Sequence, residues 1–259
     1  MANDHGDEMA AISFGKNTLW LHAPKTLAFP ANRVDIWKLH LDHAVTEKPC
    51  ANVLSADEQA RASRFHFEKD QIHFARCRSA LRNLLAAYLT MPPDMIQFEY
   101  QASGKPQLAA KQNPNALQFN VSHSGGVALI AIGSEHRLGV DIEKIRRDVD
   151  TEALAERFFS IRERDGLRAF PQDLRVRGFF ACWTRKEAFL KATGTGLSFP
   201  LADFSVTTHP DRDPKLEELE GNFDAGKPWL LKDLGVGDAH HATVAIDHPQ
   251  ARLETYSWN

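Results

Sequence analysis

Apolar residues recur at helical spacing in two long segments of the chain. One segment runs from Lys69 to Leu89, and the other runs from about Asp173 to Thr193, where Gly194 follows as a C-terminal stop. A shorter helix is predicted before each of them. The first short helix begins at the capping box Ser55-Ala-Asp-Glu58, and the second begins at Thr151 as N-cap. The pattern therefore predicts two pairs, each of a short and a long helix.

The other apolar runs are short and rich in β-branched or alternating residues, which is typical of strands. They predict strands at Val34–Leu39, Gln97–Gln101, Leu117–Ser122, Val127–Ile132, Leu138–Glu143, Phe204–Thr207 and Ala242–Asp247. Because helices and strands do not alternate strictly, the predicted class is α+β. The charge-rich segment Pro210–Lys227 is predicted as a surface loop, and residues 1–16 as a loose terminus.

The chain also resembles itself. Val34–Leu39 matches Val140–Ile145 with identical Val, Asp, Ile and Lys, at an offset of 140 − 34 = 106 residues. At the same offset, pairs of residues in both long helices and in a later strand are identical: Phe74 and Phe180, Ala75 and Ala181, Leu84 and Leu190, Ala86 and Ala192, Phe98 and Phe204. Three elements in one order at one spacing predict a duplicated unit. The two predicted halves are residues 1–133 and 134–259, with similar folds.

Composition places the chain among ordinary globular proteins. It has 259 residues, 43% of them apolar, and 31 basic against 34 acidic side chains. No apolar run approaches the roughly 20 residues of a membrane helix, and the acidic start lacks a signal sequence, so a cytoplasmic protein without membrane contact is expected. Cys50, Cys77 and Cys182 are too far apart for a zinc motif and are expected to be buried thiols.

The balanced charge argues against nucleic-acid binding, but it hides a local bias. Between residues 61 and 82 there are six basic side chains and two acidic ones. That segment is a candidate for holding phosphate groups.

Two carboxylates share one face of the predicted strand Leu138–Glu143. Asp141 and Glu143 alternate with buried apolar positions, and Gly139 leaves space beside them. Side chains two residues apart on a strand can converge on one hard cation. The alternative is a solvent-facing edge with two unrelated acids.

A third carboxylate, Glu187, falls on the apolar stripe of the second long helix, with Lys191 one turn later. A helical ion pair is the simpler explanation, but a core-facing carboxylate must be paired or bind a metal. The first half has Asp35, Trp37 and Leu81 at the positions that match the three acids. Only the second half therefore keeps all three, which predicts a magnesium site built by one half, covered by the other, and acting on a phosphate substrate.

Between the halves, the segment Phe119–Gly126 runs from a strand into a turn of small residues. Ser122, His123 and the exposed amides of this turn could hold a phosphate, although a lone histidine is more often structural. A serine hydrolase is disfavoured because neither Ser122 nor Ser124 stands in a G-x-S-x-G motif. The segment Gly194-Thr-Gly196 follows a helix instead of preceding one, and so it is a weak dinucleotide motif.

These motifs resemble those of the 4′-phosphopantetheinyl transferases, specifically the surfactin-type (Sfp-type) branch with two fused pseudo-symmetric halves. Leu138-Gly-Val-Asp-Ile-Glu143 is similar to the family motif G-[VI]-D-[IV]-E, and Trp183-Thr-Arg-Lys-Glu-Ala-Phe-Leu-Lys191 to W-x-x-K-E-A-x-x-K. Gly104-Lys-Pro106 and Phe119-Asn-Val-Ser-His-Ser124 resemble two further blocks. The resemblance extends from about Ser55 to Val206 and implies an active site at the interface of the two halves.

The resemblance implies a reaction and a role for each matched residue. The enzyme would transfer 4′-phosphopantetheine from coenzyme A to a serine of an apo acyl- or peptidyl-carrier protein and release adenosine 3′,5′-bisphosphate. Asp141, Glu143 and Glu187 would hold Mg²⁺, Asp141 and Lys191 would contact the pyrophosphate, and Glu187 or a metal-bound water would act as base. The residues implied in binding the nucleotide phosphates are Arg61, Lys105, Ser122 and His123.

One residue departs from the family pattern. Glu58 stands where some members have a lysine near the nucleotide, so the contact is expected to be weaker or to move to Arg64 or Arg82. Phe189 or Leu197 could seat a helix of the carrier. Two rivals remain open: another Mg-dependent phosphotransfer or hydrolysis enzyme, and a non-catalytic coenzyme A binding protein.

Overall fold

The computed structural model describes residues 18–42, 53–101, 104–196, 199–219 and 228–258. Its helices are α1 (Ala56–Ala62), α2 (Glu68–Leu89), α3 (Thr151–Phe158), α4 (Ile161–Arg168) and α5 (Gln172–Thr193), with short 3-10 turns at Pro93–Met95, Ala110–Gln112 and Leu201–Asp203. Its strands are β1 (Leu21–His22), β2 (Arg33–His40), β3 (Phe98–Tyr100), β4 (Pro106–Leu108), β5 (Leu117–Ser124), β6 (Val127–Ser134), β7 (Leu138–Lys144), β8 (Phe204–Val206), β9 (Leu216–Leu219), β10 (Leu230–Asp233), β11 (His240–Ile246) and β12 (Arg252–Trp258). The predicted α+β class is confirmed.

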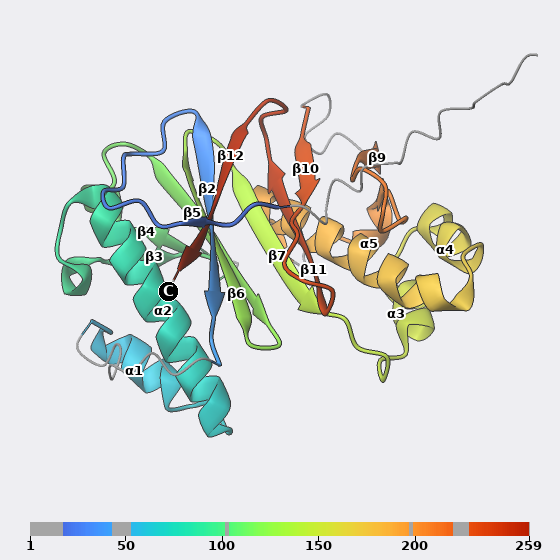
Figure 1. The fold of residues 1–259 in the computed structure, drawn as a ribbon, viewed down its shortest axis with the longest axis horizontal. Coiled ribbons are helices and arrows are strands. Elements are labelled where there is room, and N and C mark those ends of the chain that lie inside the picture. The colour runs from blue at the N-terminus through green and yellow to red at the C-terminus, as the bar shows by residue number, and fades with distance from the viewer. Residues whose placement is uncertain (1–17, 43–52, 102–103, 197–198, 220–227, 259) are drawn as a thin grey trace, which may run out of the picture.

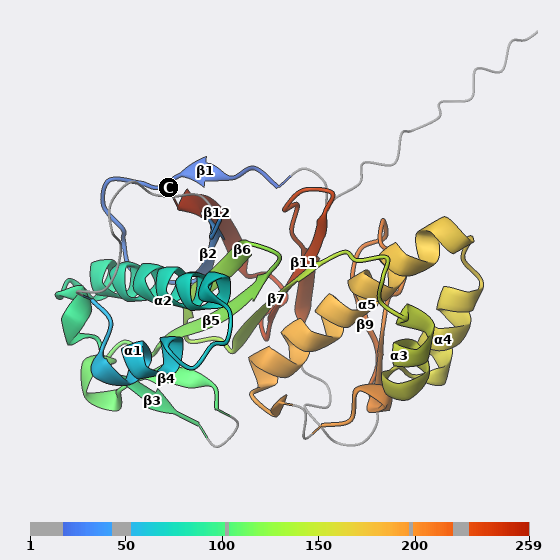
Figure 2. The same cartoon turned by 90° about the horizontal axis from the view of Figure 1, so that it is seen from below.

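Two sheets are stacked between the two long helices. Figure 1 shows α2 on one side of the molecule, α5 on the other and the sheets between them, and Figure 2 shows the same arrangement after a quarter turn. The first sheet has the strand order β1-β12-β2-β6-β5 and the second has the order β10-β11-β7. None of the helices in the described ranges is long and apolar enough to cross a membrane.

Strand periodicity divides the apolar side chains into three layers. Even-numbered residues of β2 and β7, such as Ile36 and Val140, face each other in the cluster between the sheets. On the other side of β2, Trp37 packs in the cluster that α2 covers. On the other side of β7, the residues face α5. Asp35 and Asp141 consequently occupy matching positions, each on a sheet face covered by a helix of 22 residues.

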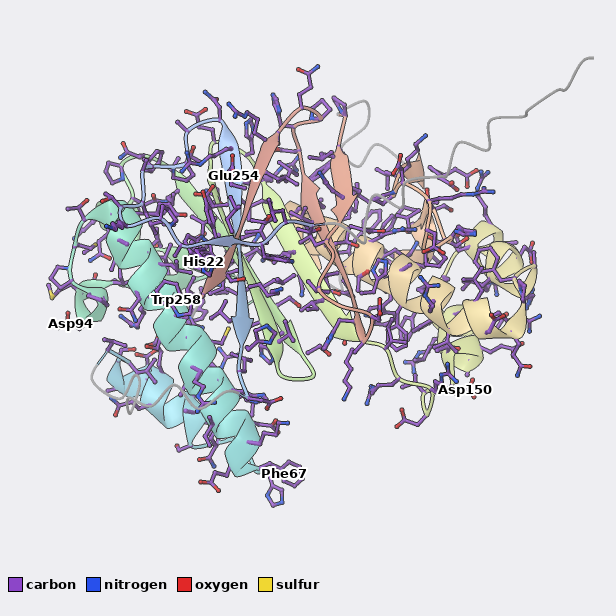
Figure 3. All side chains as sticks on the ribbon, viewed as in Figure 1. His22, Phe67, Asp94, Asp150, Glu254 and Trp258 are labelled. Carbon is purple, nitrogen blue, oxygen red and sulfur yellow. The ribbon has the colours of Figure 1, made fainter. Side chains whose placement is uncertain are left out.

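The last strand lies in the first sheet. β12 runs parallel to β2, with Leu253 opposite Val34, and β1 pairs with the other edge of β12, also in parallel. Figure 3 labels Glu254 and Trp258 on this strand. Trp37 stacks on Tyr256 with ring centroids 4.6 Å apart. The predicted division assigns residues 252–258 to the second half, whereas their hydrogen bonds and ring contacts are made with β2.

Most predicted elements are present, with small corrections. Both long helices end at a residue in the left-handed conformation, Thr90 for α2 and Gly194 for α5. The N-cap of α3 is Asp150 and not Thr151, since the Asp150 carboxylate accepts a hydrogen bond from the Ala153 amide at 3.0 Å. The predicted loop Pro210–Lys227 contains the strand β9, which pairs with β8.

Some sequence predictions concern residues outside the described ranges. Cys77 and Cys182 are buried thiols as expected, and Cys50 lies outside the described residues. The predicted loose terminus, residues 1–16, also lies outside them.

Candidate active site and family

Asp141, Lys191 and Ser122 form one hydrogen-bonded group between β7, α5 and β5. Lys191 Nζ donates to Asp141 Oδ1 at 2.6 Å and to Ser122 Oγ at 3.0 Å. Ser122 Oγ in turn donates to Asp141 Oδ1 at 2.9 Å. The Asp141 side chain is almost fully buried, whereas Lys191 remains partly exposed. The structure therefore brings together three of the predicted site residues from three separate elements.

Along one edge of β7, the backbone amides donate hydrogen bonds to side chains of β5 instead of to the backbone of a neighbouring strand. Asn120 Oδ1 accepts from the Val140 amide at 2.9 Å, and Ser124 Oγ accepts from the Lys144 amide at 3.0 Å. Ser124 Oγ also donates to Glu143 Oε2 at 2.8 Å. Because every second residue of β5 makes such a contact, the register of β5 against β7 fixes where Asp141 and Glu143 stand.

Glu187 and Glu143 lie close enough to repel each other and Asp141. Burial raises the pKa of Glu187, the charges of Asp141 and Glu143 raise it further, and Lys191 lowers it. Burial also raises the pKa of Glu143, as does Asp141, against the hydrogen bond from Ser124. Such mutual repulsion is expected of acids that surround a cation site or exchange protons.

The glycine of the strand motif allows α5 to approach β7 closely. A Cβ atom on Gly139 would lie 2.2 Å from the carbonyl oxygen of Ala188 and 2.4 Å from the amide nitrogen of Ala192. The space that the sequence predicted beside the acids is thus filled by the backbone of α5. This contact places Glu187 and Lys191 over Asp141.

Lys105 lies at the C-terminal end of α5. Its Nζ donates to the carbonyl of Lys191 at 2.6 Å and to the carbonyl of Leu138 at 3.4 Å. Burial lowers its pKa to about 8, with a further contribution from the charge of Lys191. Lys105 therefore adds a second, weakly held positive charge beside the Asp141 group.

One observation supports a divalent cation at these residues. Asp141 Oδ2 is buried and has no hydrogen-bond partner among the described residues. A buried carboxylate oxygen without a partner is costly unless a cation binds it. No three His, Cys, Asp or Glu side chains of the described residues are close enough to hold a metal as they stand, and Lys191 is the cation that now contacts Asp141.

Arg61 and His123 lie together in a neighbouring pocket of about 230 Å³ between α1, α2 and β5. Arg61 is stacked over Phe74 at 5.6 Å from its ring centroid. Partial burial lowers the pKa of His123, and the charge of Lys191 lowers it too, which ties this pocket electrostatically to the Asp141 group. Arg61 and His123 thus line one pocket close to the Asp141 group, and their role in binding the nucleotide stays a prediction.

Two smaller expectations need correction, and a third concerns a residue outside the described ranges. Arg82 cannot hold a nucleotide, because its side chain is 2% exposed and its donors bind Glu58, Pro93 O and Ile96 O. Phe189 cannot seat a carrier, because it is fully buried against Phe204 and Trp229. Leu197 lies outside the described residues.

Sequence reasoning missed the role of the first lysine in the helix motif. Lys186 is fully buried, and its Nζ donates to both oxygens of Glu163, at 2.6 and 2.7 Å, and to the carbonyl of Phe204. Glu163 also accepts from the amide of Val206 at 2.8 Å. Lys186 therefore joins α5, α4 and β8. In the sequence, Lys186 is marked only by its place in the motif. That place does not tell whether the lysine binds the substrate or connects parts of the fold.

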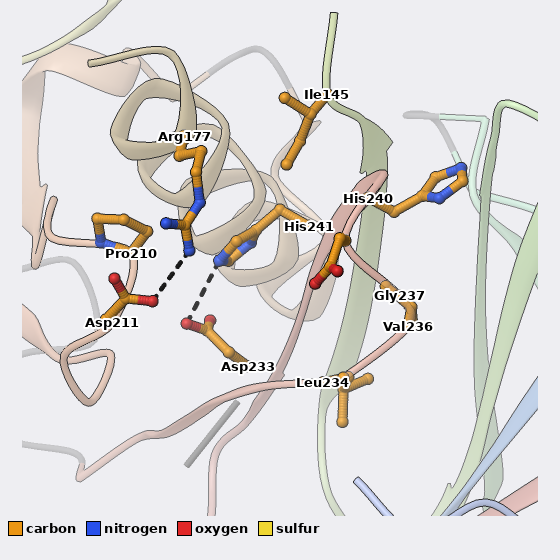
Figure 4. A pocket seen from close by; sticks show the side chains of 12 residues that line it. Ile145, Arg177, Pro210, Asp211, Asp233, Leu234, Val236, Gly237, His240 and His241 are labelled. Carbon is orange, nitrogen blue, oxygen red and sulfur yellow. Dashed lines mark hydrogen bonds and ion pairs between the residues drawn. The ribbon is translucent and has the colours of Figure 1, made fainter. Parts of the chain in front are cut away.

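A second network that the sequence analysis missed contacts α5 just before Lys186, and Figure 4 shows part of it. It borders a pocket of about 400 Å³, where Asp233 faces His241 at 3.5 Å. His241 Nδ1 lies 2.7 Å from Thr184 Oγ1, and Thr243 Oγ1 donates to Asp233 Oδ1 at 2.8 Å. Arg185, paired with Asp233, holds the pKa of that carboxyl well below its usual range despite burial. Thr184 stands one turn before Glu187, so this network helps to fix the helix that carries the candidate base.

With this geometry in place, comparison with known proteins identifies the family. Residues 45–135 match "4′-phosphopantetheinyl transferase, N-terminal", and residues 137–245 match the "4′-phosphopantetheinyl transferase superfamily". The chain belongs to the 4′-phosphopantetheinyl transferases of the Sfp type. The predicted membership is therefore confirmed.

Individual relatives cover most of the chain. It is 36% identical to the 4′-phosphopantetheinyl transferase HetI of Nostoc sp. over 228 residues, which are 88% of this chain and 93% of the relative. It is 29% identical to the 4′-phosphopantetheinyl transferase Sfp of Bacillus subtilis over 217 residues, covering 83% and 92% of the two chains. It is also 29% identical to the L-aminoadipate-semialdehyde dehydrogenase-phosphopantetheinyl transferase of Xenopus laevis over 218 residues, covering 78% and 72%.

Proposed function

We propose that this chain transfers 4′-phosphopantetheine from coenzyme A to a serine of an apo acyl- or peptidyl-carrier protein, using Mg²⁺ at Asp141, Glu143 and Glu187. The proposal rests mainly on the buried oxygen Asp141 Oδ2, which lacks a partner among the described residues while Lys191 holds the other oxygen. Bound Mg²⁺ would neutralise the pyrophosphate of coenzyme A. The expected place of the reaction is the cytoplasm, and it involves neither nucleic acid nor a membrane.

Lys191 and Glu187 are assigned the two chemical tasks. Lys191 would donate to the pyrophosphate, since its ammonium group is partly exposed and bound to Asp141 and Ser122. Glu187 would accept the proton of the carrier serine, because its carboxylate lies beside Asp141, Glu143 and Lys191 in the candidate site. The serine oxygen then forms a bond to the phosphorus that bears pantetheine, the bond from that phosphorus to the bridging oxygen breaks, and adenosine 3′,5′-bisphosphate leaves.

Positioning is as important as charge for this reaction, because phosphoryl-type transfer requires little covalent help from the protein. Hydrogen bonds from the β7 amides to side chains of β5 fix β7, and the close contact at Gly139 fixes α5 against it. The site residues therefore stand on rigid elements. Arg61, Lys105, Ser122 and His123 are proposed to bind the nucleotide phosphates. Ser122 belongs to the Asp141 group, Lys105 lies beside that group, and Arg61 and His123 line the adjoining pocket.

We also infer two pseudo-symmetric halves with the active site at their interface. The matching positions of Asp35 and Asp141, each under a helix of 22 residues, support this inference. In the first half, Asp35 is bound by Tyr88 Oη at 2.7 Å and by Arg33 Nε at 2.9 Å. The carboxylate of Asp35 is thus already hydrogen-bonded by side chains and is not open to a ligand. This agrees with a single active site in a molecule that has two similar halves.

The test uses the full chain with coenzyme A, Mg²⁺ and a panel of purified apo-carriers. Mass spectrometry should show a gain of one phosphopantetheine on at least one carrier, and none without Mg²⁺. Consumption of coenzyme A without carrier modification would instead identify another Mg-dependent phosphotransfer or hydrolysis enzyme. Binding of coenzyme A without turnover would identify a non-catalytic binding protein.

A further inference from the structure

The turn between β5 and β6 is contacted by side chains of both halves. It consists of Gly125 and Gly126, whose φ angles of +55° and +84° are both positive, as a two-residue type I′ hairpin turn requires. A Cβ atom on Gly126 would lie 2.1 Å from Asp42 Oδ2, and one on Gly125 would lie 2.6 Å from Lys144 Cδ. The segment after β2 therefore contacts one side of the turn, and the end of β7 contacts the other.

Asp42 is held against the turn by two residues of α2. His73 Nε2 donates a hydrogen bond to Asp42 Oδ1 at 2.8 Å, and Lys69 Nζ lies 3.1 Å from the same oxygen. The hydrogen bonds from His73 and Lys69 hold the pKa of Asp42 below its usual value, so the carboxylate stays charged. Because one oxygen of Asp42 is bound to a buried histidine, the other oxygen stays directed at Gly126.

The backbone before Asp42 makes a second connection between α2 and the turn. The amide of Leu41 donates to the carbonyl of Gly126 at 2.7 Å. Arg76, three residues after His73 in α2, donates from Nη1 to the carbonyl of Leu41. Residues 41 and 42 are therefore both fixed by α2, and both contact the turn.

On the side of the second half, the turn leads to a candidate metal ligand. Ser124 directly precedes the turn, and its Oγ donates to Glu143 Oε2 at 2.8 Å and accepts from the Lys144 amide at 3.0 Å. His240 Nε2 donates to the carbonyl of Ser124 at 3.2 Å. Because a hairpin turn sets the register of its strands, a displaced turn would displace Ser124 and change the orientation of the Glu143 carboxylate.

We propose that His73 and Asp42 are positioning residues for Glu143 and act through the β5–β6 turn and Ser124. This inference rests on the proposed function, in which Glu143 binds Mg²⁺. Groups that orient a metal ligand raise the affinity for the metal, and removal of a direct partner typically weakens it about 10- to 100-fold. His73 is more remote from Glu143 than a direct partner, so a smaller loss is expected from its removal.

The experiment measures metal binding without turnover, in the full chain with coenzyme A and no carrier. Mn²⁺ replaces Mg²⁺, and its binding is followed by electron paramagnetic resonance. His73→Phe removes the donor and keeps a ring, and it should raise the Kd of Mn²⁺ about 3- to 10-fold. His73→Gln supplies an N–H donor again and should recover most of this loss. The affinity for coenzyme A without metal, measured by calorimetry, should change by less than about 2-fold.

A double substitution tests whether the effect passes through Ser124. Ser124→Ala removes the direct partner of Glu143 and should raise the Kd of Mn²⁺ about 10- to 100-fold. In that background, His73→Phe should add less than about 2-fold, because the connection to Glu143 is already lost. Additive losses in the double variant would overturn the proposal.

Another route from His73 leads to the pocket lined by His123. Burial lowers the pKa of His123, and the charges of Lys191 and His73 lower it further, whereas the charge of Asp70 raises it. If His73 acted by this route, His73→Phe would weaken binding of coenzyme A without metal as much as binding of Mn²⁺. That result would also overturn the proposal.

Matched controls complete the comparison. His136 also faces a carboxylate, that of Asp247 at 3.7 Å, but it lies at the opposite end of β6 from the turn. His136→Phe should leave the Kd of Mn²⁺ within about 2-fold. If His73→Phe does not fold, as judged by circular dichroism, Asp42→Ala carries the same comparison at a more exposed position. Equal Mn²⁺ binding by wild type and Asp141→Asn, or failure of the wild type to modify any carrier, would instead refute the proposed function.

Discussion

Asp141 and Asp35 are the same residue type at matching positions, yet the structure gives them different partners. Asp141 is bound by a partly exposed lysine and has one oxygen without a partner, whereas Asp35 is fully buried and bound by Arg33 and Tyr88. Burial raises the pKa of Asp35, and these two hydrogen bonds oppose the increase. A carboxylate satisfied by the protein stabilises the fold, and one left open is available to a ligand.

We therefore predict opposite effects for the same substitution at the two positions. Asp141→Asn should lower kcat for carrier modification at least about 100-fold, because it removes charge next to the reacting phosphate, and should leave the melting temperature nearly unchanged. Asp35→Asn should lower stability by about 1–3 kcal/mol through the buried hydrogen bonds and leave kcat per folded molecule intact. Thermal unfolding and carrier mass measure both quantities. Similar loss of activity in the two variants would contradict the distinction.

Lys105 gives a prediction on pH. Its pKa is lowered to about 8 by burial and by Lys191, so it carries a full charge below that pH and loses it above. If it binds a phosphate of coenzyme A, kcat/KM for coenzyme A should fall as pH rises through about 8. Lys105→Arg should remove this alkaline limb, because arginine stays protonated at that pH. An identical limb in both proteins would show that another group titrates.

At the scale of elements, the contact between β7 and α5 governs how accurately the site is built. Gly139→Ala would place a methyl group against the α5 backbone, which cannot move aside as a side chain can. We predict a loss of about 1–3 kcal/mol in the free energy of unfolding together with a lower kcat, since Glu187 and Lys191 move with the helix.

Gly133→Ala is the matched control for this prediction. Its Cβ would lie 3.0 Å from side-chain atoms of Leu138 and Val34, and these can adjust. Denaturant unfolding should therefore show a smaller loss of stability, with kcat retained. Equal effects on kcat in both variants would show that the closeness of α5 does not matter for the chemistry.

Local patterns were enough to predict the elements that carry the site. Helical spacing gave α2 and α5 to within one residue at each end, and alternation placed Asp141 and Glu143 on the face that α5 covers. Strand β12 was missed because its partner β2 is distant in sequence, and β10 was missed because its four residues are too few for a clear pattern.

At the scale of the whole molecule, β12 ties the two ends of the chain together. It lies between β1 and β2, so its removal would leave the β2 backbone groups that face it without a partner and would uncover Trp37. We predict that a chain ending at residue 248 is insoluble or unfolds without cooperativity, as measured by circular dichroism on heating. A chain ending at residue 258 should match the full chain. A cooperative transition in the shorter chain would contradict this role of β12.

This arrangement has a consequence for synthesis on the ribosome. Val34 emerges early and Leu253 almost last, although the two are neighbours in the sheet. The first sheet therefore cannot be completed during translation, and residues 18–134 must wait with an open edge at β2 until the final segment appears. The second sheet is also completed late, because its central strand β11 directly precedes β12 in the chain. Pairing of β2 with β12 is thus expected to be the step that completes the first sheet, after the helices and the other strands of both halves have been synthesised.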